Sequence, residues 1–158
     1  MPAPGVPGFQ WVAEGLTHNE FGLPVSAASA HVAQINKRTK KLQQFEFGDL
    51  WGEVYGEGDT AIVAFGSSVG PAREAARRLA EISRPIRVVA LRQLFPLPMI
   101  NLGRALAGMQ QIIVLEQNHG AQLFHYLRSR GALPAAAESI ARPGPLPFRP
   151  AEITAYLA

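Results

Sequence analysis

The stretch that decides the fold is an apolar run that ends abruptly in polar residues: Gln111-Ile112-Ile113-Val114-Leu115-Glu116-Gln117-Asn118-His119-Gly120-Ala121-Gln122-Leu123. Its first half is short, continuous and apolar, which predicts a strand buried on both faces. A helical pattern begins soon afterwards. Ligands and partner surfaces meet an open parallel sheet at the carboxyl ends of its strands. We therefore expect Glu116, Asn118 and Gln122 to lie at a functional edge.

Strands and helices alternate on both sides of this stretch. We expect strands at residues 60–65, 86–91 and 111–116 and near 139–141, and helices at residues 26–45, 72–82, 98–108, 121–130 and 150–157. The segment 48–59 is rich in glycine and aspartate and is predicted to form turns. Alternation of this kind predicts βαβ units, and hence an α/β fold with a mostly parallel sheet and helices on both faces.

The first 24 residues have a different composition from the rest. Proline and glycine are dense there, which favours an extended N-terminal arm or linker over residues 1–24 and an α/β domain over residues 25–158. A chain of 158 residues is long enough to bury a core without a metal or a disulfide.

Composition narrows the function classes. With 47% hydrophobic and 17% charged residues and no apolar run of membrane-spanning length, we expect a soluble, cytoplasmic protein with no membrane partner. The net charge of +3 is concentrated in residues 37–41 and 73–78, which read as solvated helix faces, so we expect no nucleic-acid partner. The absence of cysteine excludes disulfides, thiolate nucleophiles and cysteine-ligated iron-sulfur clusters.

The turn after the first buried strand allows three interpretations. Backbone amides at Gly66, Ser67, Ser68 and Gly70 could approach an anion at a helix N-terminus, which suits a free-standing module for a phosphorylated ligand. A tight strand-to-helix turn is the favoured structural alternative. The same residues match Gly-x-Ser-x-Gly, in which Ser68 would be the nucleophile of a hydrolase.

The hydrolase hypothesis needs an acid and a histidine later in the chain. Glu116 followed by His125 has the required order, whereas His119 is only three residues from Glu116. The chain is short for such an enzyme.

Four histidines also raise the question of a metal site. His18, His31, His119 and His125 lack a His-x-x-x-His spacing and no acid completes a ligand set, so no metal site is expected.

The polar residues after the third strand also have alternatives. Glu116, Asn118 and Gln122 could act as an acid, an amide donor and a substrate clamp. They could instead cap a helix, with Asn118 satisfying free amides and Glu116 in an ion pair. We favour a subunit contact. The apolar loop Leu94-Phe95-Pro96-Leu97-Pro98 is expected to pack on the core, or, if exposed, to bind a partner.

Several segments in the same order resemble one protein family. The opening contains Pro4-Gly5 and Gly15-Leu16-Thr17-His18-Asn19-Glu20-Phe21-Gly22, in which Thr17 replaces a glutamate of the family. Lys37-Arg38, Lys40-Lys41-Leu42, Ile62 to Gly70, Glu74-Ala75 and Leu94 to Pro98 follow. Glu116-x-Asn118 with Gln122-Leu123 resembles Glu-x-Asn-x-x-Gly-Gln, with Ala121 in place of a glycine, and Pro147-Phe148-Arg149-Pro150-Ala151-Glu152-Ile153 resembles the closing motif.

Together these segments resemble the C-terminal part of the alpha subunit of 2-oxoacid:ferredoxin oxidoreductases, most closely the 2-oxoglutarate type. The resemblance implies a three-layer αβα sandwich, similar to the transketolase C-terminal domain, that supports catalytic domains and subunit contacts. It implies an oligomeric enzyme that decarboxylates a 2-oxo acid, reduces ferredoxin and forms an acyl-coenzyme A.

The resemblance also assigns the chemistry to other parts of the enzyme. Thiamine diphosphate, Mg²⁺ and the iron-sulfur cluster would be bound by the remaining domains or subunits, and this chain would bind none of them and would not be catalytic alone. Within the chain, the resemblance implies interface or ligand-proximal positions for Glu116, Asn118, Gln122, His18 and Glu20.

Overall fold

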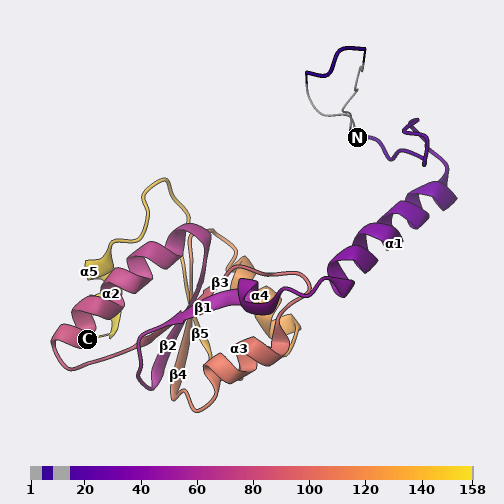
Figure 1. The fold of residues 1–158 in the computed structure, drawn as a ribbon. Helices are drawn as coiled ribbons and strands as arrows, with labels where there is room; N and C mark the ends of the chain where they lie inside the picture. The colour runs from indigo at the N-terminus through magenta and orange to yellow at the C-terminus, as the bar shows by residue number, and fades with distance from the viewer. Residues whose placement is uncertain (1–4, 9–14, 158) are drawn as a thin grey trace. The chain divides into compact units, whose positions relative to one another are not determined.

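The computed structural model describes residues 5–8 and 15–157 (Figure 1). Its contacts divide the chain into two compact units, Met1–Phe45 and Glu46–Ala158. Helix α1 (Ala28–Gln44) confirms the first predicted helix and falls in the first unit. We had expected it to belong to the α/β domain, and the boundary between arm and domain at residues 24 and 25 stays a prediction.

The described part of the first unit before α1 is a turn closed by one asparagine. The Asn19 side-chain oxygen accepts hydrogen bonds from the amides of Phe21 and Leu23, each at 3.0 Å. The Thr17 hydroxyl lies 3.1 Å from Nδ1 of His31 on α1, which fixes the turn to the helix. Predictions for residues 1–4 and 9–14 lie outside the described residues.

The second unit contains the α/β fold. Its strands are β1 (Gly52–Tyr55), β2 (Thr60–Phe65), β3 (Arg87–Leu91), β4 (Gln111–Glu116) and β5 (Glu138–Ala141). Its α-helices are α2 (Val69–Glu81), α3 (Met99–Leu106), α4 (Gln122–Ser129) and α5 (Pro150–Leu157), and two 3-10 turns, η1 (Gly48–Trp51) and η2 (Gly66–Ser68), precede β1 and α2. All strands and helices expected from the sequence are present.

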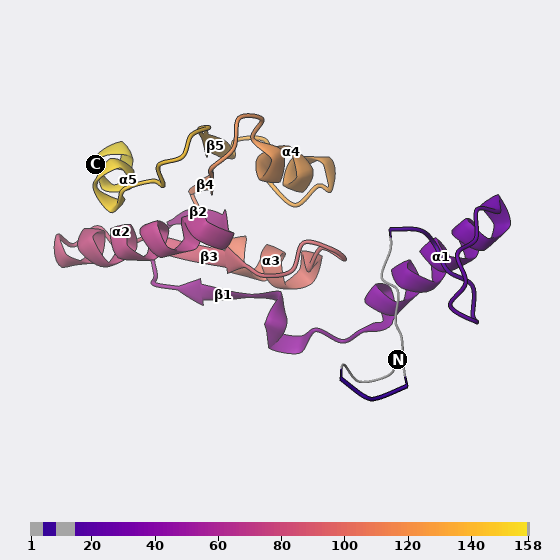
Figure 2. The same ribbon diagram turned by 90° about the horizontal axis from the view of Figure 1, so that it is seen from above.

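The sheet has the order β1-β3-β2-β4-β5 and is parallel except at one edge. One core joins its first face to α3 and α4, and a second core joins the opposite face to α2 and α5, so helices cover both faces (Figures 1 and 2). The predicted three-layer αβα sandwich with a mostly parallel sheet is confirmed.

Strand β1 corrects the sequence analysis, which placed only turns at residues 48–59. β1 pairs with β3 in antiparallel orientation. Its flanking glycines are required by close backbone approach: a Cβ at Gly52 would lie 2.6 Å from the Ala90 carbonyl oxygen, and one at Gly56 would lie 2.5 Å from that of Ile86. These glycines therefore mark a tightly packed edge strand as well as turns.

Candidate functional site

Two polar turns meet at the carboxyl edge of the sheet because their strands are neighbours. β2 and β4 run parallel, with Ala64 beside Leu115. The turn after β2 and the loop after β4 consequently border the same groove, which has a volume of about 480 Å³. The residues that line it are Phe65, Gly66, Ser67, Ser68, Leu94, Glu116, Gln117, Asn118, Gln122, Leu123 and Tyr126. The structure thus brings together the two sets of residues that the sequence singled out separately.

Glu116 fixes the start of α4. It is buried, with 5% of its surface exposed. Its carboxylate accepts hydrogen bonds from the backbone amides of Leu123 at 2.7 Å and Phe124 at 2.9 Å, and from the Asn118 side-chain amide at 2.5 Å. A carboxylate at this position also complements the positive end of the helix dipole.

Asn118 completes the cap by accepting a hydrogen bond from the Gln122 amide at 3.2 Å. The capping alternative is therefore confirmed for Asn118. The expected ion pair of Glu116 is wrong. In the described part of the chain, the hydrogen-bond partners of the Glu116 carboxylate are amides, because the free N–H groups at the start of α4 point at it. Gln122 contributes its backbone to the cap, and its side chain is exposed beside the groove.

The chain enters α4 through a strained residue. Ala121 has φ 46° and ψ 46°, the left-handed conformation that favours glycine. The resemblance noted in the sequence places a glycine here, and the geometry gives the physical reason for that preference.

The far wall of the groove is a fixed apolar loop. The Tyr126 hydroxyl donates a hydrogen bond to the Leu94 carbonyl at 2.6 Å, and the Gln93 side chain donates one to the Pro96 carbonyl at 2.5 Å. Leu97 is buried in the core, whereas 49% of Phe95 is exposed. Core packing is therefore confirmed for Leu97, whereas binding of a partner at the exposed Phe95 stays a prediction.

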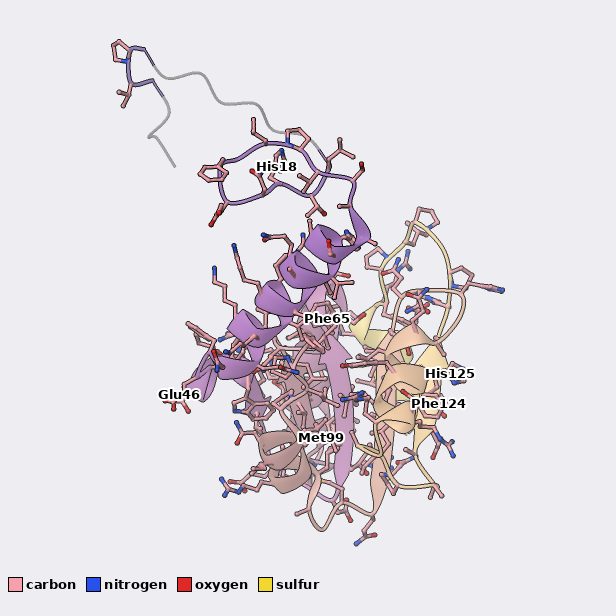
Figure 3. All side chains as sticks on the ribbon, turned by 90° about the vertical axis from the view of Figure 1, so that its right-hand side faces the viewer. His18, Glu46, Phe65, Met99, Phe124 and His125 are labelled. Carbon is pink, nitrogen blue, oxygen red and sulfur yellow. The ribbon has the colours of Figure 1, made fainter. Side chains whose placement is uncertain are left out.

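Three other residues of the groove were not predicted from the sequence. Phe65 ends β2 with 44% of its surface exposed (Figure 3). Gln117 donates hydrogen bonds to the carbonyls of Gly144 and Leu146 at 2.8 and 3.0 Å, so it holds the distant segment after β5. Tyr126 follows Gln122 by four residues, and this spacing on one helix face was the available signal.

The turn Gly66–Gly70 does not act as one surface. Gly66, Ser67 and Ser68 line the groove, but Gly70 lines a separate hollow of about 520 Å³ beside α2. Ser68 is buried, with 4% exposed, and begins the transition into α2. An anion site would therefore involve the first three residues, and that role stays a prediction.

The described residues do not assemble a hydrolase triad. The Glu116 carboxylate is occupied by the helix cap, and no histidine appears among the groove-lining residues of the described chain. His125 is exposed on the outer side of α4, and its ring contacts Phe124 with centroids 5.5 Å apart (Figure 3). Ser68 thus lacks the general base that a serine nucleophile requires.

His18 and Glu20 belong to the first unit. His18 lines a hollow of about 440 Å³ together with Lys37 and Arg38, and Glu20 is exposed. Their proximity to a ligand or interface stays a prediction. Within residues 5–8 and 15–157, no group of three or more His, Asp or Glu side chains is arranged to hold a metal ion, and no helix has the length and apolarity to cross a membrane.

Comparisons with known proteins agree with this architecture. Residues 58–149 match the family described as pyruvate:ferredoxin oxidoreductase core domain II. The chain is 29% identical over 129 residues to the alpha subunit of 2-oxoacid:ferredoxin oxidoreductase 2 from Aeropyrum pernix, covering 77% of this chain and 20% of that protein.

The fold also matches solved structures. The 2-oxoglutarate:ferredoxin oxidoreductase of Magnetococcus marinus, solved with 2-oxoglutarate, coenzyme A and succinyl-CoA, aligns with a TM-score of 0.64 at 28% identity, over 99% of this chain and 28% of that chain. The present chain therefore spans roughly a fifth to a quarter of the length of these relatives. It belongs to the pyruvate:ferredoxin oxidoreductase core domain II family.

Proposed function

We propose that this chain is one domain of the alpha subunit of a 2-oxoacid:ferredoxin oxidoreductase, with 2-oxoglutarate as the oxo acid. The family match and the Aeropyrum pernix relative support the enzyme class. The Magnetococcus marinus enzyme, whose structure contains 2-oxoglutarate and coenzyme A, supports the substrate and the acyl acceptor. The reaction would join decarboxylation to the reduction of ferredoxin and the formation of succinyl-coenzyme A.

The role of this domain would be to support the active centre and to form an interface at the groove. The observation that carries this role is the composition of the groove. Its rim has the exposed side chain of Gln122, and its wall is apolar, with Phe65 and Leu94. A partly exposed aromatic residue on an apolar wall is the kind of surface that a partner covers, because aromatic residues are enriched at protein interfaces. The buried cap at Glu116 holds this surface in place.

The cofactors of the reaction would be bound by the rest of the enzyme. Iron-sulfur clusters are held by cysteine thiolates, and this chain has no cysteine. We place thiamine diphosphate and Mg²⁺ in the remaining domains, with other subunits and ferredoxin as partners. The role of this chain in the reaction would be to orient and support the active centre, through β2, β4 and the loops that follow them.

The test starts from the assembly purified gently from its own cells and assayed for 2-oxoglutarate-dependent ferredoxin reduction. Gln122→Trp would then fill the groove without touching the cap, because only the backbone of Gln122 takes part in it. Ala135→Trp places the same indole side chain at an exposed position outside the groove. We expect Gln122→Trp to reduce activity or retention in the assembly by at least about tenfold and Ala135→Trp to preserve both. Equal behaviour of the two variants would refute the interface role.

A second candidate is a module that binds a phosphorylated ligand at the start of α2. It is favoured by the position of Gly66, Ser67 and Ser68, which line the groove directly before that helix. Titration of the chain with inorganic phosphate, followed by calorimetry, would test it. Ser67→Asp should abolish binding by charge repulsion, because Ser67 is exposed beside the proposed anion. Absence of heat with the original chain would exclude this candidate.

A further inference from the structure

Helix α1 has an apolar stripe that the described residues of its own unit leave partly exposed. No residue of the helix is buried. Val32, Ile35 and Leu42 are exposed by 55%, 43% and 42%. The turn before the helix forms a hollow that is lined, on α1, by Gln34, Lys37 and Arg38, and none of the stripe residues lines it.

The spacing of the stripe is that of a coiled-coil seam. Its residues are Ala28, Val32, Ile35, Thr39 and Leu42, with alternating steps of four and three. That alternation gives a mean period of 3.5 residues, which keeps one narrow line of side chains facing a partner helix. Figure 1 shows α1 as one continuous helix, so the seam is not interrupted.

The charges of α1 indicate the kind of partner. The helix has four cations, Lys37, Arg38, Lys40 and Lys41, and no acid. At about 100° per residue, the three lysines lie on the side opposite the seam and Arg38 borders the seam. A partner helix in the seam would therefore meet Arg38 at its flank, where an aspartate or glutamate is the complementary residue.

The length of the seam argues against a stand-alone pair of two α1 helices. From residue 28 to residue 42 it spans about 20 Å, or two heptads, whereas sustained coiled coils extend over three to four. Alanine and threonine in the seam reduce the apolar contact further. Pairing of this strength persists when other contacts hold the partner nearby, as they do within one assembly.

We propose that α1 packs, through this seam, on an amphipathic helix with an acidic flank in another part of the same oxidoreductase. This inference rests on the proposed function and adds the partner's chemistry. The contact is separate from the groove in the second unit and uses different residues.

Cysteine labelling tests the proposal directly, because the chain has no cysteine of its own. Ile35→Cys places a thiol in the seam, and Lys40→Cys places one on the opposite side, outside the hollow that contains His18, as the matched control. In the purified assembly we expect maleimide to label Ile35→Cys at least about tenfold more slowly than Lys40→Cys. In the isolated chain the two rates should be similar.

Each outcome decides the question. Equal labelling in the material purified from cells would overturn the proposal, whether or not that material is active. Protection of Ile35→Cys in an assembly without 2-oxoglutarate-dependent activity would support the helix contact and refute the proposed function. Protection in the isolated chain that increases with its concentration would show self-pairing, and protection by phosphatidylserine vesicles would show a membrane contact. Either result would overturn the proposed partner.

The acidic flank has its own paired test. Arg38→Glu and Lys40→Glu change the charge by the same amount, but only Arg38 borders the seam. We expect Arg38→Glu to weaken retention of the chain in the assembly by about fivefold at low salt, and Lys40→Glu to leave it unchanged. Equal weakening by both would indicate attraction to a general negative surface and would overturn the acidic-helix assignment.

Discussion

Removal of the Glu116 carboxylate should destabilise the attachment of α4 to the end of β4. Glu116→Ala deletes the acceptor of two backbone amides, those of Leu123 and Phe124, and of the Asn118 side chain. Hydrogen bonds that end on a carboxylate contribute about 1.5 to 3 kcal/mol each. The Asn118 side chain is only partly buried and can turn to water, so the two buried backbone amides set the cost, and we expect the free energy of unfolding to fall by about 3 to 6 kcal/mol. Glu116→Gln retains one acceptor oxygen and should cost about 2 kcal/mol.

The assay is urea denaturation of the full chain, followed by circular dichroism, with Glu81→Gln as the control. Glu81 is a surface carboxylate with 60% of its side chain exposed, and its pairing with Arg77 should contribute less than about 1 kcal/mol. A loss of under about 1 kcal/mol in Glu116→Ala would refute the capping argument. A similar loss in Glu81→Gln would show that the effect of removing Glu116 is not specific to the cap.

Three further substitutions test separate parts of the fold. Ala121→Gly should raise the free energy of unfolding by about 1 kcal/mol, measured in urea, because φ is 46° at that position; a decrease would contradict the strain. Gly58→Ala should lower the melting temperature by several degrees, at a cost of about 2 kcal/mol or more, because its Cβ would lie 2.2 Å from the Pro85 carbonyl oxygen. Arg142 holds the pKa of Glu152 at about 2, below its ordinary value of 4.5, through their hydrogen bonds. Since the folded-state pKa is the lower one, this stabilisation is present above about pH 4.5 and is lost as the pH falls towards 2. Arg142→Gln should therefore reduce the urea midpoint more near pH 6 than near pH 2, where only its contacts with the Pro147 carbonyl and the Phe148 ring are lost; an equal reduction at both would be inconsistent with this linkage.

The sequence predicted the parallel part of the sheet because strands that are buried on both faces are continuous apolar runs, which are easily recognised. Residues 60–65 and 111–116 are continuous apolar runs, and each is followed by a helical pattern. Strand β1 has no such continuous apolar run. It has four residues at an edge of the sheet, and the glycines around it suggested turns, whereas Gly52 and Gly56 leave no room for a Cβ beside the carbonyls of Ala90 and Ile86. Close backbone approach and turn formation both favour glycine, so the sequence alone could not distinguish them.

The residues of the candidate site were largely predictable from the sequence, but their hydrogen-bond partners were predictable only in part. The order of the motifs indicated that Glu116, Asn118 and Gln122 would gather at a strand end. The partners of Glu116 could not be inferred, because they are backbone amides that every residue carries. The contact of Tyr126 with Leu94 depends on how α4 lies over the following loop, which is a property of tertiary packing.

The cap at Glu116 also separates the position of α4 from the course of the loop before it. The helix is tied to the last residue of β4, so strand and helix form one rigid piece, and residues 119 and 120 span the gap between two fixed points. Both are exposed. Neither residue takes part in the cap or lines the groove. Substitutions in that short span can therefore change what the loop presents to solvent while the groove beside it keeps its shape.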